Sequence, residues 1–319
     1  MLEARTSPPA SETAPAAGLG RGTAGPWTFD PAELSSLRRH PRFAEALRAT
    51  ASMSVMLYRG SRLTNLISND RGRFVLALAP LYFHFTRRSD DPASGLTTSR
   101  LKQFAVEQRV CSAGRAAAMI ALMRWAGMIA PAPASADRRV RLLVPTDTLI
   151  AMHRERWRRQ LQAAALVLPD LSEALLHFDD PAFTPAFAIA QAEQYASGFR
   201  FVEHAPELSL FIERNAGLLV LASILLAAAP GDDMPPREPV TVSAAALARQ
   251  FHVSRTHVIT LLRDAVAAQL LERDGSTHRL RMLPELREAT EKFFAAAFLY
   301  NRAAARAALQ AVTEGRILG

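Results

Sequence analysis

The sequence has 319 residues but only one cysteine, Cys111. A single thiol excludes an internal disulfide framework and is typical of a reducing compartment, so we expect the protein in the cytoplasm. Long hydrophobic runs are also missing: the longest covers residues 218–229, which suits a buried helix and is too short to span a bilayer. The N-terminus carries Glu3, Arg5 and several prolines where a signal peptide needs an apolar core. We therefore expect neither a secretory signal nor a membrane partner.

The sequence also lacks the short motifs that mark common enzymes. It contains no P-loop, no dinucleotide glycine fingerprint, no nucleophile elbow and no paired Cys motif. The eight histidines are scattered, and His84, His153 and His177 have no partner at the spacing of metal ligands. We therefore expect no enzymatic activity, no cofactor and no bound metal.

Lysine is scarce, since Lys102 and Lys292 are the only two among 38 basic residues. The net charge of +8 and the pI near 10.6 are therefore due mainly to guanidinium groups, which bind phosphate oxygens and guanine edges in a forked geometry. Residues 100–159 contain twelve basic and four acidic residues, so this window alone carries +8. A GC-rich genome would account for the abundance of arginine but not for this clustering. The charge favours a polyanionic partner such as nucleic acid.

Two halves of the sequence repeat the same marks in the same order. Residues 1–27 are rich in Ala, Pro, Gly, Ser and Thr without periodicity, which predicts a disordered arm. After it we expect a first half at 28–165 and a second at 166–319, mostly helical, with short β-patterned stretches at 139–144 and 278–283. The separation of matching residues falls from 150 at the first pair to 139 at the last, as in a duplication whose second copy has shorter loops. The matching pairs are Asp30-Pro31-Ala32 with Asp180-Pro181-Ala182, Gly72 with Gly217, Thr97 with Thr241, Ser112 with Ser254, and Pro145 with Pro284.

Residues 240–286 of the second half have the pattern of a winged helix-turn-helix. Leu247 and Phe251 are four residues apart and face one core, and Ser254 is a good N-cap for the helix that follows the turn. One side of that helix is apolar, and the other carries the residue types that reach base edges or phosphates in a major groove. Asp274-Gly275 is a hairpin turn signal, which places basic residues on a wing. The candidate DNA contacts of this half are Ser254, Arg255, Thr256, His257, Thr260, Arg263, Arg279 and Arg281.

The first half has a weaker version of the same pattern. Its turn ends at Ser112, and Ala116, Met119, Ile120 and Met123 form the inward stripe of the next helix. The outward face consists of small residues around Arg115, while the predicted wing is rich in arginine. We therefore expect phosphate and minor-groove contacts from this half and more of the base reading from the second. The candidate contacts here are Ser112, Arg115, Arg138, Arg139 and Arg141.

This order of elements resembles the MarR family of bacterial transcriptional regulators, over nearly all of residues 28–319, taken as two fused protomer-like halves. The wing sequence Asp137-Arg138-Arg139 is the most family-like motif. The resemblance implies a mainly α fold with two winged helix-turn-helix domains, at about 95–145 and 239–284, each with a small β-hairpin wing, in a pseudo-twofold arrangement like a MarR dimer. The second wing, residues 273–276, lacks the Asp-Arg-Arg order, and the first recognition helix has mostly small residues. These departures favour an asymmetric DNA site over a palindrome.

The resemblance also implies that a small aromatic or lipophilic effector enters between the helical interface and the DNA-binding lobe. Aromatic residues at such positions are more often part of an ordinary core than the lining of a site. Cys111 precedes the first recognition helix, so the resemblance implies that its oxidation would disturb DNA binding, as in redox-sensing relatives of the family. However, it matches the apolar Val253, which favours a buried, inert thiol. The candidate lining residues are Tyr58, Tyr82, Phe83, Trp125, Trp157 and Tyr195.

The sequence therefore predicts a sequence-specific, double-stranded DNA-binding transcriptional regulator, either a monomeric pseudo-dimer or a homodimer. Two alternatives remain open. One is a plasmid or phage replication initiator with tandem winged helices, and the other is a winged-helix protein that serves protein–protein assembly. Around Trp157, the arginines at 154, 156, 158 and 159 are either a further phosphate-binding surface or a solvated helix face.

Overall fold

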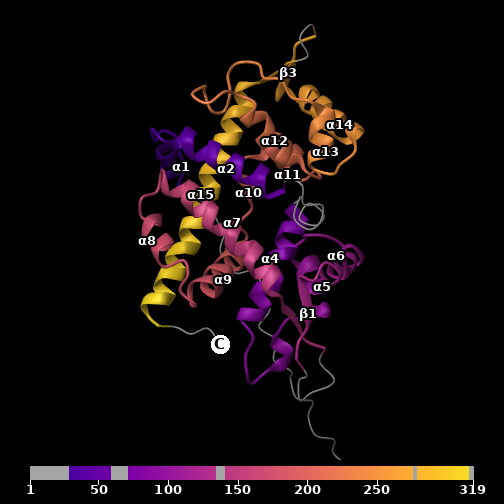
Figure 1. The fold of residues 1–319 in the computed structure, drawn as a ribbon, viewed down its shortest axis with the longest axis vertical. Coiled ribbons are helices and arrows are strands. Elements are labelled where there is room, and N and C mark those ends of the chain that lie inside the picture. The colour runs from indigo at the N-terminus through magenta and orange to yellow at the C-terminus, as the bar shows by residue number, and fades with distance from the viewer. Residues whose placement is uncertain (1–28, 59–70, 134–140, 276–278, 316–319) are drawn as a thin grey trace, which may run out of the picture.

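The computed structural model describes residues 29–58, 71–133, 141–275 and 279–315, and the predicted arm at 1–27 lies outside them. Within that part the protein is mainly helical with two small hairpins, as expected (Figure 1). The elements in chain order are α1 (Pro31–Arg38), α2 (Phe43–Tyr58), α4 (Arg71–Phe85), η1 (Pro92–Ser94), α5 (Thr98–Glu107), α6 (Ala113–Trp125), β1 (Ile129–Pro131), β2 (Leu143–Pro145), α7 (Asp147–Ala165), α8 (Leu171–Leu176), α9 (Phe183–Ala196), α10 (Phe201–His204), η2 (Pro206–Leu208), α11 (Ser209–Ile212), α12 (Gly217–Leu226), α13 (Ala244–Gln250), α14 (Arg255–Ala267), β3 (Leu271–Arg273), β4 (Leu280–Met282) and α15 (Pro284–Thr313).

Several helices begin where the sequence supplies a capping side chain. The Asp30 carboxylate accepts a hydrogen bond of 2.9 Å from the backbone N–H of Ala32, with Pro31 in the first turn of α1. The Thr97 hydroxyl accepts one of 3.1 Å from the backbone N–H of Arg100 at the start of α5. These side chains satisfy N–H groups that a helix start leaves without a helical partner, and so they fix where each helix begins.

The described strands form two antiparallel hairpins, β1 with β2 and β3 with β4. Ile129 lies opposite Pro145 in the first hairpin, and Leu271 lies opposite Met282 in the second. The predicted β-patterned stretches at 139–144 and 278–283 thus correspond to the shorter β2 and β4. Residues 139, 140 and 278 lie outside the described residues.

A third short segment joins each hairpin through backbone hydrogen bonds. The Leu143 N–H donates to the Leu96 carbonyl at 2.8 Å, and Val240 and Leu280 exchange two hydrogen bonds of 2.7 and 2.8 Å. Both segments come directly before the helices that precede the hairpin, α5 and α13. We call α5, α6, β1 and β2 the first helix-hairpin unit, and α13, α14, β3 and β4 the second.

The two helix-hairpin units share backbone details as well as element order. The turn between the helices contains a left-handed residue in each, Arg109 with φ 52° and His252 with φ 53°. Only a few non-glycine residues adopt this conformation, so its recurrence at matching places is informative. The same backbone bond follows it in each turn: Val110 N–H to the Ala105 carbonyl, and Val253 N–H to the Ala248 carbonyl.

By sequence Asp180 matches Asp30, but in the structure the turn at Asp180 resembles the turn at His40. The N–H of Phe183, the first residue of α9, donates to the Asp180 carbonyl at 3.0 Å, and the N–H of Phe43, the first residue of α2, donates to the His40 carbonyl at 2.9 Å. Asp30 instead caps α1. The expected match of Asp30 with Asp180 is therefore wrong. In the first half, both α1 and α2 start close to a proline, at Asp30-Pro31 and His40-Pro41. The sequence match used the first of these two steps.

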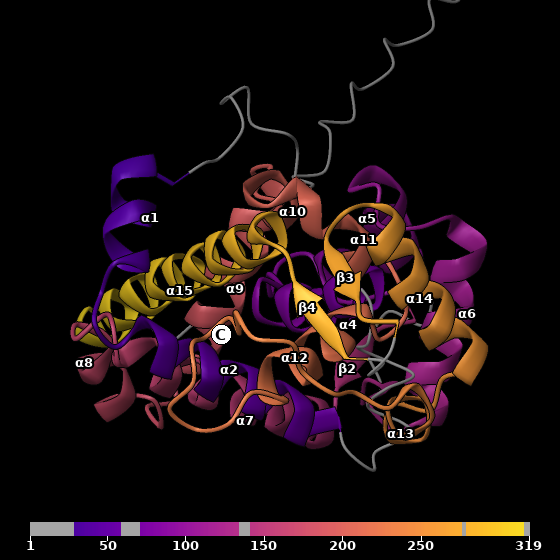
Figure 2. The same ribbon diagram turned by 90° about the horizontal axis from the view of Figure 1, so that it is seen from above.

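The central helices pack across the boundary between the halves. Helix α2 packs against α7 of its own half and α12 of the other, while α9 packs against α15 of its own half and α4 of the other. These two sets of contacts have the same pattern, because α2 and α9 start at matching turns and α7 and α15 follow the two hairpins. In Figures 1 and 2 the two helix-hairpin units lie at one side of these crossing helices.

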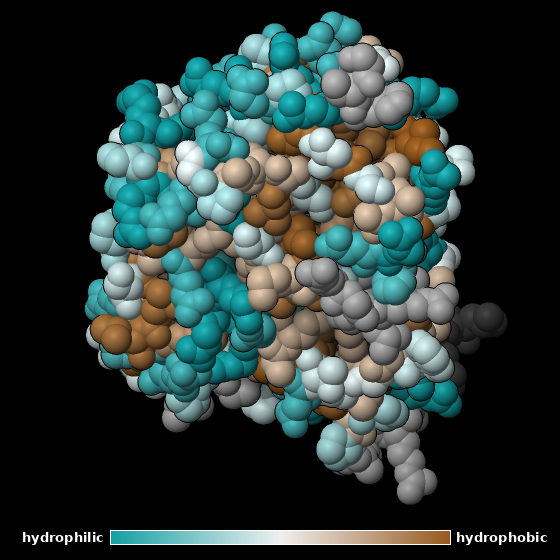
Figure 3. Space-filling model, turned by 45° about the horizontal axis from the view of Figure 1, so that its top comes forward, coloured by the Kyte–Doolittle hydropathy of each residue, from teal (hydrophilic) through white to brown (hydrophobic). Residues whose placement is uncertain are grey.

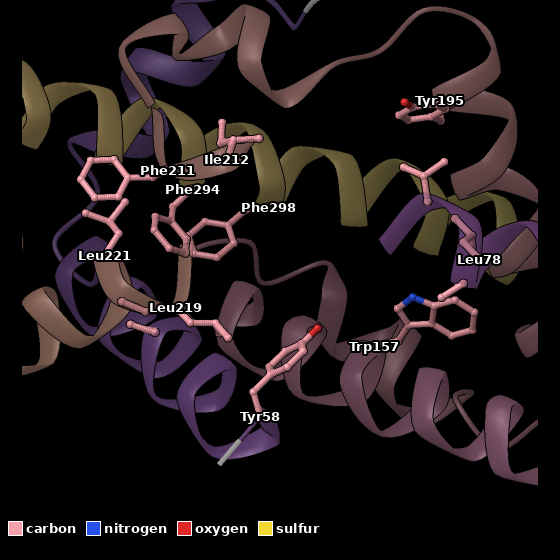
Figure 4. Packing of buried hydrophobic residues seen from close by; sticks show 14 of the residues in the cluster. Tyr58, Leu78, Trp157, Tyr195, Phe211, Ile212, Leu219, Leu221, Phe294 and Phe298 are labelled. Carbon is pink, nitrogen blue, oxygen red and sulfur yellow. The ribbon is translucent and has the colours of Figure 1, made fainter. Parts of the chain in front are cut away.

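One cluster of buried side chains extends through both halves. Figure 4 shows Trp157 and Leu78 of the first half and Phe211, Phe294 and Phe298 of the second around this interior. Side chains from both sides of the expected boundary at residues 165 and 166 therefore share one core.

The longest apolar run of the sequence, residues 218–229, forms most of α12. Leu219, Val220 and Ile224 of this helix are buried, as expected for a core helix. No single helix in the described part of the chain has the length and apolar character needed to cross a membrane. The segments Pro206–Ile212 and Gly217–Leu226 meet that criterion only together, as a pair bent by 105°.

His153 lies fully inside the core on α7. Its Nε2 is 3.0 Å from the Ala77 carbonyl, and its Nδ1 is 2.7 Å from the Arg156 guanidinium. A carbonyl only accepts and a guanidinium only donates, so this pair of contacts requires the neutral ring with its proton on Nε2. Burial, together with the charge of Arg156, lowers the pKa of His153 well below its usual value.

We expect acidification to destabilise the protein through His153. Below pH 6.5, the ordinary histidine pKa, the unfolded chain binds a proton that the folded core excludes. The free energy of unfolding then falls by up to about 1.4 kcal/mol per pH unit until the pH reaches the depressed pKa. Urea denaturation of His153→Gln between pH 7.5 and 5 should show a flatter pH dependence than wild type, whereas Leu176→Ala, at an exposed position, should not. An equal slope in His153→Gln and wild type would contradict the assignment.

Candidate nucleic-acid interface

Helix α14 presents the predicted polar face to solvent. Its N-cap, Ser254, accepts a hydrogen bond of 3.0 Å from the backbone N–H of His257. Arg255, Thr256 and Arg263 are exposed and Thr260 is half-buried on the outer side of the helix. The opposite stripe is buried, as the periodicity predicts; it consists of Val258, Leu261 and Ala265.

His257 faces the protein rather than solvent. Its Nε2 donates to the Asn215 carbonyl at 2.8 Å, in the turn that precedes α12. A second contact from the same turn joins Arg214 to the Asp264 carboxylate at 2.8 Å. Its hydrogen bond with Arg214 is the main cause of the lowered pKa of Asp264, to which Arg263 also contributes at 3.2 Å. The candidate contact His257 is therefore placed where it holds α14 against the body.

Helix α6 has the predicted cap and inward face but a much less polar outer face. Ser112 accepts a hydrogen bond of 3.3 Å from the backbone N–H of Arg115, and Arg115 itself is exposed. Its inward stripe is buried as expected: Ala116, Met119, Ile120 and Met123.

Both inner faces are apolar, but the outer faces of α6 and α14 differ in polarity. When Ser112 and Ser254 are matched, four outward residues of α14 correspond to alanine or glycine in α6. These four residues of α6 are all exposed. Alanine and glycine offer no side-chain hydrogen bond to a base, although alanine can contact a thymine methyl group. The four pairs are Arg255 and Ala113, Thr256 and Gly114, Thr260 and Ala118, and Arg263 and Ala121.

The structure describes three of the five predicted wing arginines. Arg281 is exposed on β4 and lies 3.5 Å from Glu272, and Arg279 is exposed directly before β4 and donates to the Pro239 carbonyl. Arg141 is exposed beside the first hairpin. Arg138 and Arg139 lie outside the described residues.

The arginines around Trp157 bind other parts of the protein. Arg154 and Arg158 both donate to the Asp179 carboxylate at 2.6 Å, and Arg156 is buried beside His153. The hydrogen bond from Arg158 is the main cause of the lowered pKa of Asp179. Arg154 and Arg158 are therefore engaged between α7 and the α8–α9 turn and Arg156 in the core, while Arg159 pairs with Glu155 of its own helix at 2.5 Å, so the four do not form one phosphate-binding face.

Most of the aromatic residues predicted to line an effector site are core residues. Four of the six are buried, Tyr82 is half-buried, and Trp125 is 75% exposed at the end of α6. A cavity of about 40 Å³ lies between α4, α5, α9 and α15, lined among others by Phe104 and Tyr195. Sites for drug-sized ligands occupy roughly 300–1,000 Å³, so this cavity is far smaller than such a site. The buried four are Tyr58, Phe83, Trp157 and Tyr195.

Cys111 packs against the core but is half-buried and not buried as expected. The expected match of Cys111 with Val253 is wrong by one residue, because Val110 follows the left-handed turn residue as Val253 does. In the part of the chain that the structure describes, no cluster of His, Cys, Asp and Glu is suited to a metal ion. Sequence patterns did not identify Arg200, Arg214 or Asn215, because their contacts are with residues far away in the chain.

Comparison with known proteins yields no match, whether to a protein-family model, to a curated protein or to a solved structure.

Proposed function

We propose that this protein is a sequence-specific DNA-binding regulator of transcription that uses two winged helix-turn-helix units of one chain. The observation that carries this proposal is the outer face of α14. A capped helix that follows a tight turn and precedes a basic hairpin exposes Arg255, Thr256 and Arg263 together. This is the geometry and chemistry with which such helices contact base edges in a major groove.

The exchanged packing of the central helices supports the pseudo-twofold, MarR-like part of the proposal. A dimeric regulator holds two reading helices through a shared helical interface. Here the pairs α2 with α12 and α9 with α4 provide equivalent contacts between the two halves within one chain. Such paired packing is what a fused dimer would show, and it therefore supports the proposal.

The unequal outer faces support an asymmetric DNA site. Helix α14 would read bases, whereas α6, with small side chains at the four matching positions, would lie close to the groove and contact phosphates or thymine methyl groups. On the face shown in Figure 3, hydrophilic residues line the top and much of the left side, with hydrophobic residues in separate patches between them. A small aromatic effector stays a prediction from the family resemblance.

Selection of bound duplexes from a random DNA library tests this function directly. We expect one asymmetric motif with a strongly specified part and a weakly specified part. A palindrome would contradict the unequal roles of α6 and α14. Enrichment of no sequence would contradict DNA reading itself and favour a role in protein assembly, while a motif repeated several times in a replication origin would favour a replication initiator.

The first wing is expected to contribute to affinity mainly through charge. Replacing Arg138 and Arg139 by alanine should lower the slope of log affinity against log salt by one to two units, because each phosphate contact contributes roughly 0.9. Fluorescence anisotropy with the selected duplex at several salt concentrations measures this slope. Arg306→Ala is the matched control, since Arg306 pairs with Asp170 at 3.0 Å next to α8, and α8 lies away from both helix-hairpin units in Figure 1. An unchanged slope in the Arg138 and Arg139 variant would refute the wing assignment.

A further inference from the structure

The chain between α9 and α12 lies beside both helix-hairpin units. This connecting segment, residues 197–216, contains α10, η2 and α11. In Figures 1 and 2, α11 lies between α14 of the second unit and α5 of the first. A segment in this position can fix one unit relative to the other.

The connecting segment is anchored in the core. Phe199, Leu208 and Phe211 are fully buried, and the Phe199 ring stacks on Tyr300 of α15 with centroids 4.8 Å apart. At its end, Gly217 lies so close to the Phe211 carbonyl that a Cβ atom would be 2.2 Å from that oxygen. The segment is thus packed tightly against the central helices, which limits its movement.

Polar groups on the same segment hold each of the two units. Arg200 donates to the Gln108 side chain at the end of α5 at 3.3 Å. Its guanidinium is oriented by the Phe199 carbonyl at 2.8 Å and by the Tyr195 ring, whose centroid is 3.7 Å away. At the other end, Arg214 binds Asp264 at 2.8 Å.

A second contact at that end makes the attachment of α14 directional. The Asn215 carbonyl accepts from His257 at 2.8 Å, in the first turn of α14 and about two turns before Asp264. Two contacts at different positions along a helix fix its direction as well as its location. The contact with Gln108 is at the C-terminal end of α5, immediately before the turn that leads into α6.

We propose that the connecting segment sets the separation and angle between α6 and α14, with Arg200 and Arg214 as positioning residues. What this separation and angle mean for DNA binding rests on the proposed function. Two helices that enter successive grooves must match the helical repeat of DNA, so their separation determines which spacing of the two parts of a site is bound. Arg200 and Arg214 would thereby select DNA spacing without touching DNA.

The separation of the two helices can be measured without DNA. In a Cys111→Ser background, spin labels at Ala117→Cys and Ala267→Cys, both exposed positions, report the distance from α6 to α14 by pulsed dipolar spectroscopy. We expect one narrow distribution for the otherwise wild-type chain and a broader, shifted one for Arg200→Ala with Arg214→Ala. The single variant Arg214→Lys should give a narrower distribution than the double alanine variant, since lysine can still pair with Asp264. The single variant Gln108→Ala removes the partner of Arg200 on α5 and should by itself broaden the distribution.

An unchanged distribution in the double variant would overturn the proposal. Arg306→Ala, which breaks an ion pair outside both units, is the control for a general effect of losing an arginine. Circular dichroism of each variant separates loss of folding from loss of positioning. If the double variant unfolds, Arg214→Lys and Gln108→Ala decide the question, because each leaves most of the contacts in place.

The DNA consequence is tested with the selected duplex, in which the distance between its two parts is varied by one or two base pairs. We expect wild type to favour one spacing by about tenfold. The double variant should bind all spacings within a few-fold of each other. Equal discrimination by both proteins would overturn the effect on spacing. If wild type binds no duplex, the proposed function fails, whereas the spin-label result still decides whether the segment positions the two helices.

Discussion

Replacing Arg255 and Arg263 together by alanine is expected to weaken binding of the selected duplex by about 2–6 kcal/mol, since each base-reading arginine contributes roughly 1–3 kcal/mol. Both side chains are exposed on the outer face of α14, and neither belongs to its buried stripe. The loss of affinity should therefore come from lost DNA contacts and not from unfolding. Fluorescence anisotropy with the selected duplex and with an unrelated duplex gives the affinity and the specificity.

The specificity ratio separates base reading from general charge attraction. We expect the Arg255 and Arg263 variant to lose most of its preference for the selected duplex, while binding to unrelated DNA falls much less. Arg306→Ala removes one exposed guanidinium outside both units and should leave the preference unchanged. A uniform loss on both duplexes would assign the two arginines to phosphates, and no loss at all would refute α14 as the reading helix.

Truncating Phe187 to alanine is expected to lower the free energy of unfolding by about 3–5 kcal/mol. This side chain of α9 is fully buried and lies with its ring centroid 5.0 Å from that of Trp157 on α7. Helix α9 also packs against α4 and α15, so a cavity here removes contacts that join the two halves. We expect the whole chain to lose stability in one transition.

Urea denaturation followed by circular dichroism and by tryptophan fluorescence tests this expectation. The two probes should give coincident curves for wild type and for Phe187→Ala, with the midpoint of the variant shifted to lower urea. Leu176→Ala, at a position that is 84% exposed, is the control and should leave the midpoint nearly unchanged. Two separate transitions, one for each half, would contradict a shared core.

Local features of the fold were predictable from the sequence because they depend on neighbouring residues. Ser112 and Ser254 cap helices through bonds to residues three positions ahead, and the buried stripes of α6 and α14 follow from helical spacing. The apolar run at 218–229 forms a core helix for the same reason. The match of Asp30 with Asp180 failed because an Asp-Pro dipeptide indicates that a helix starts but does not identify which helix of the fold it is.

The sequence by itself therefore determined the mainly helical architecture, the two hairpins and the polar outer face of α14, since spacing, caps and turn residues act over a few positions. Only the tertiary structure decided which helices cross between the halves, how His257 is used and where the arginines around Trp157 point. The contact of Arg200 with Gln108 joins residues 92 positions apart, and that of Arg214 with Asp264 joins residues 50 apart. Such contacts depend on how the shared core brings distant segments together, and no local pattern encodes that.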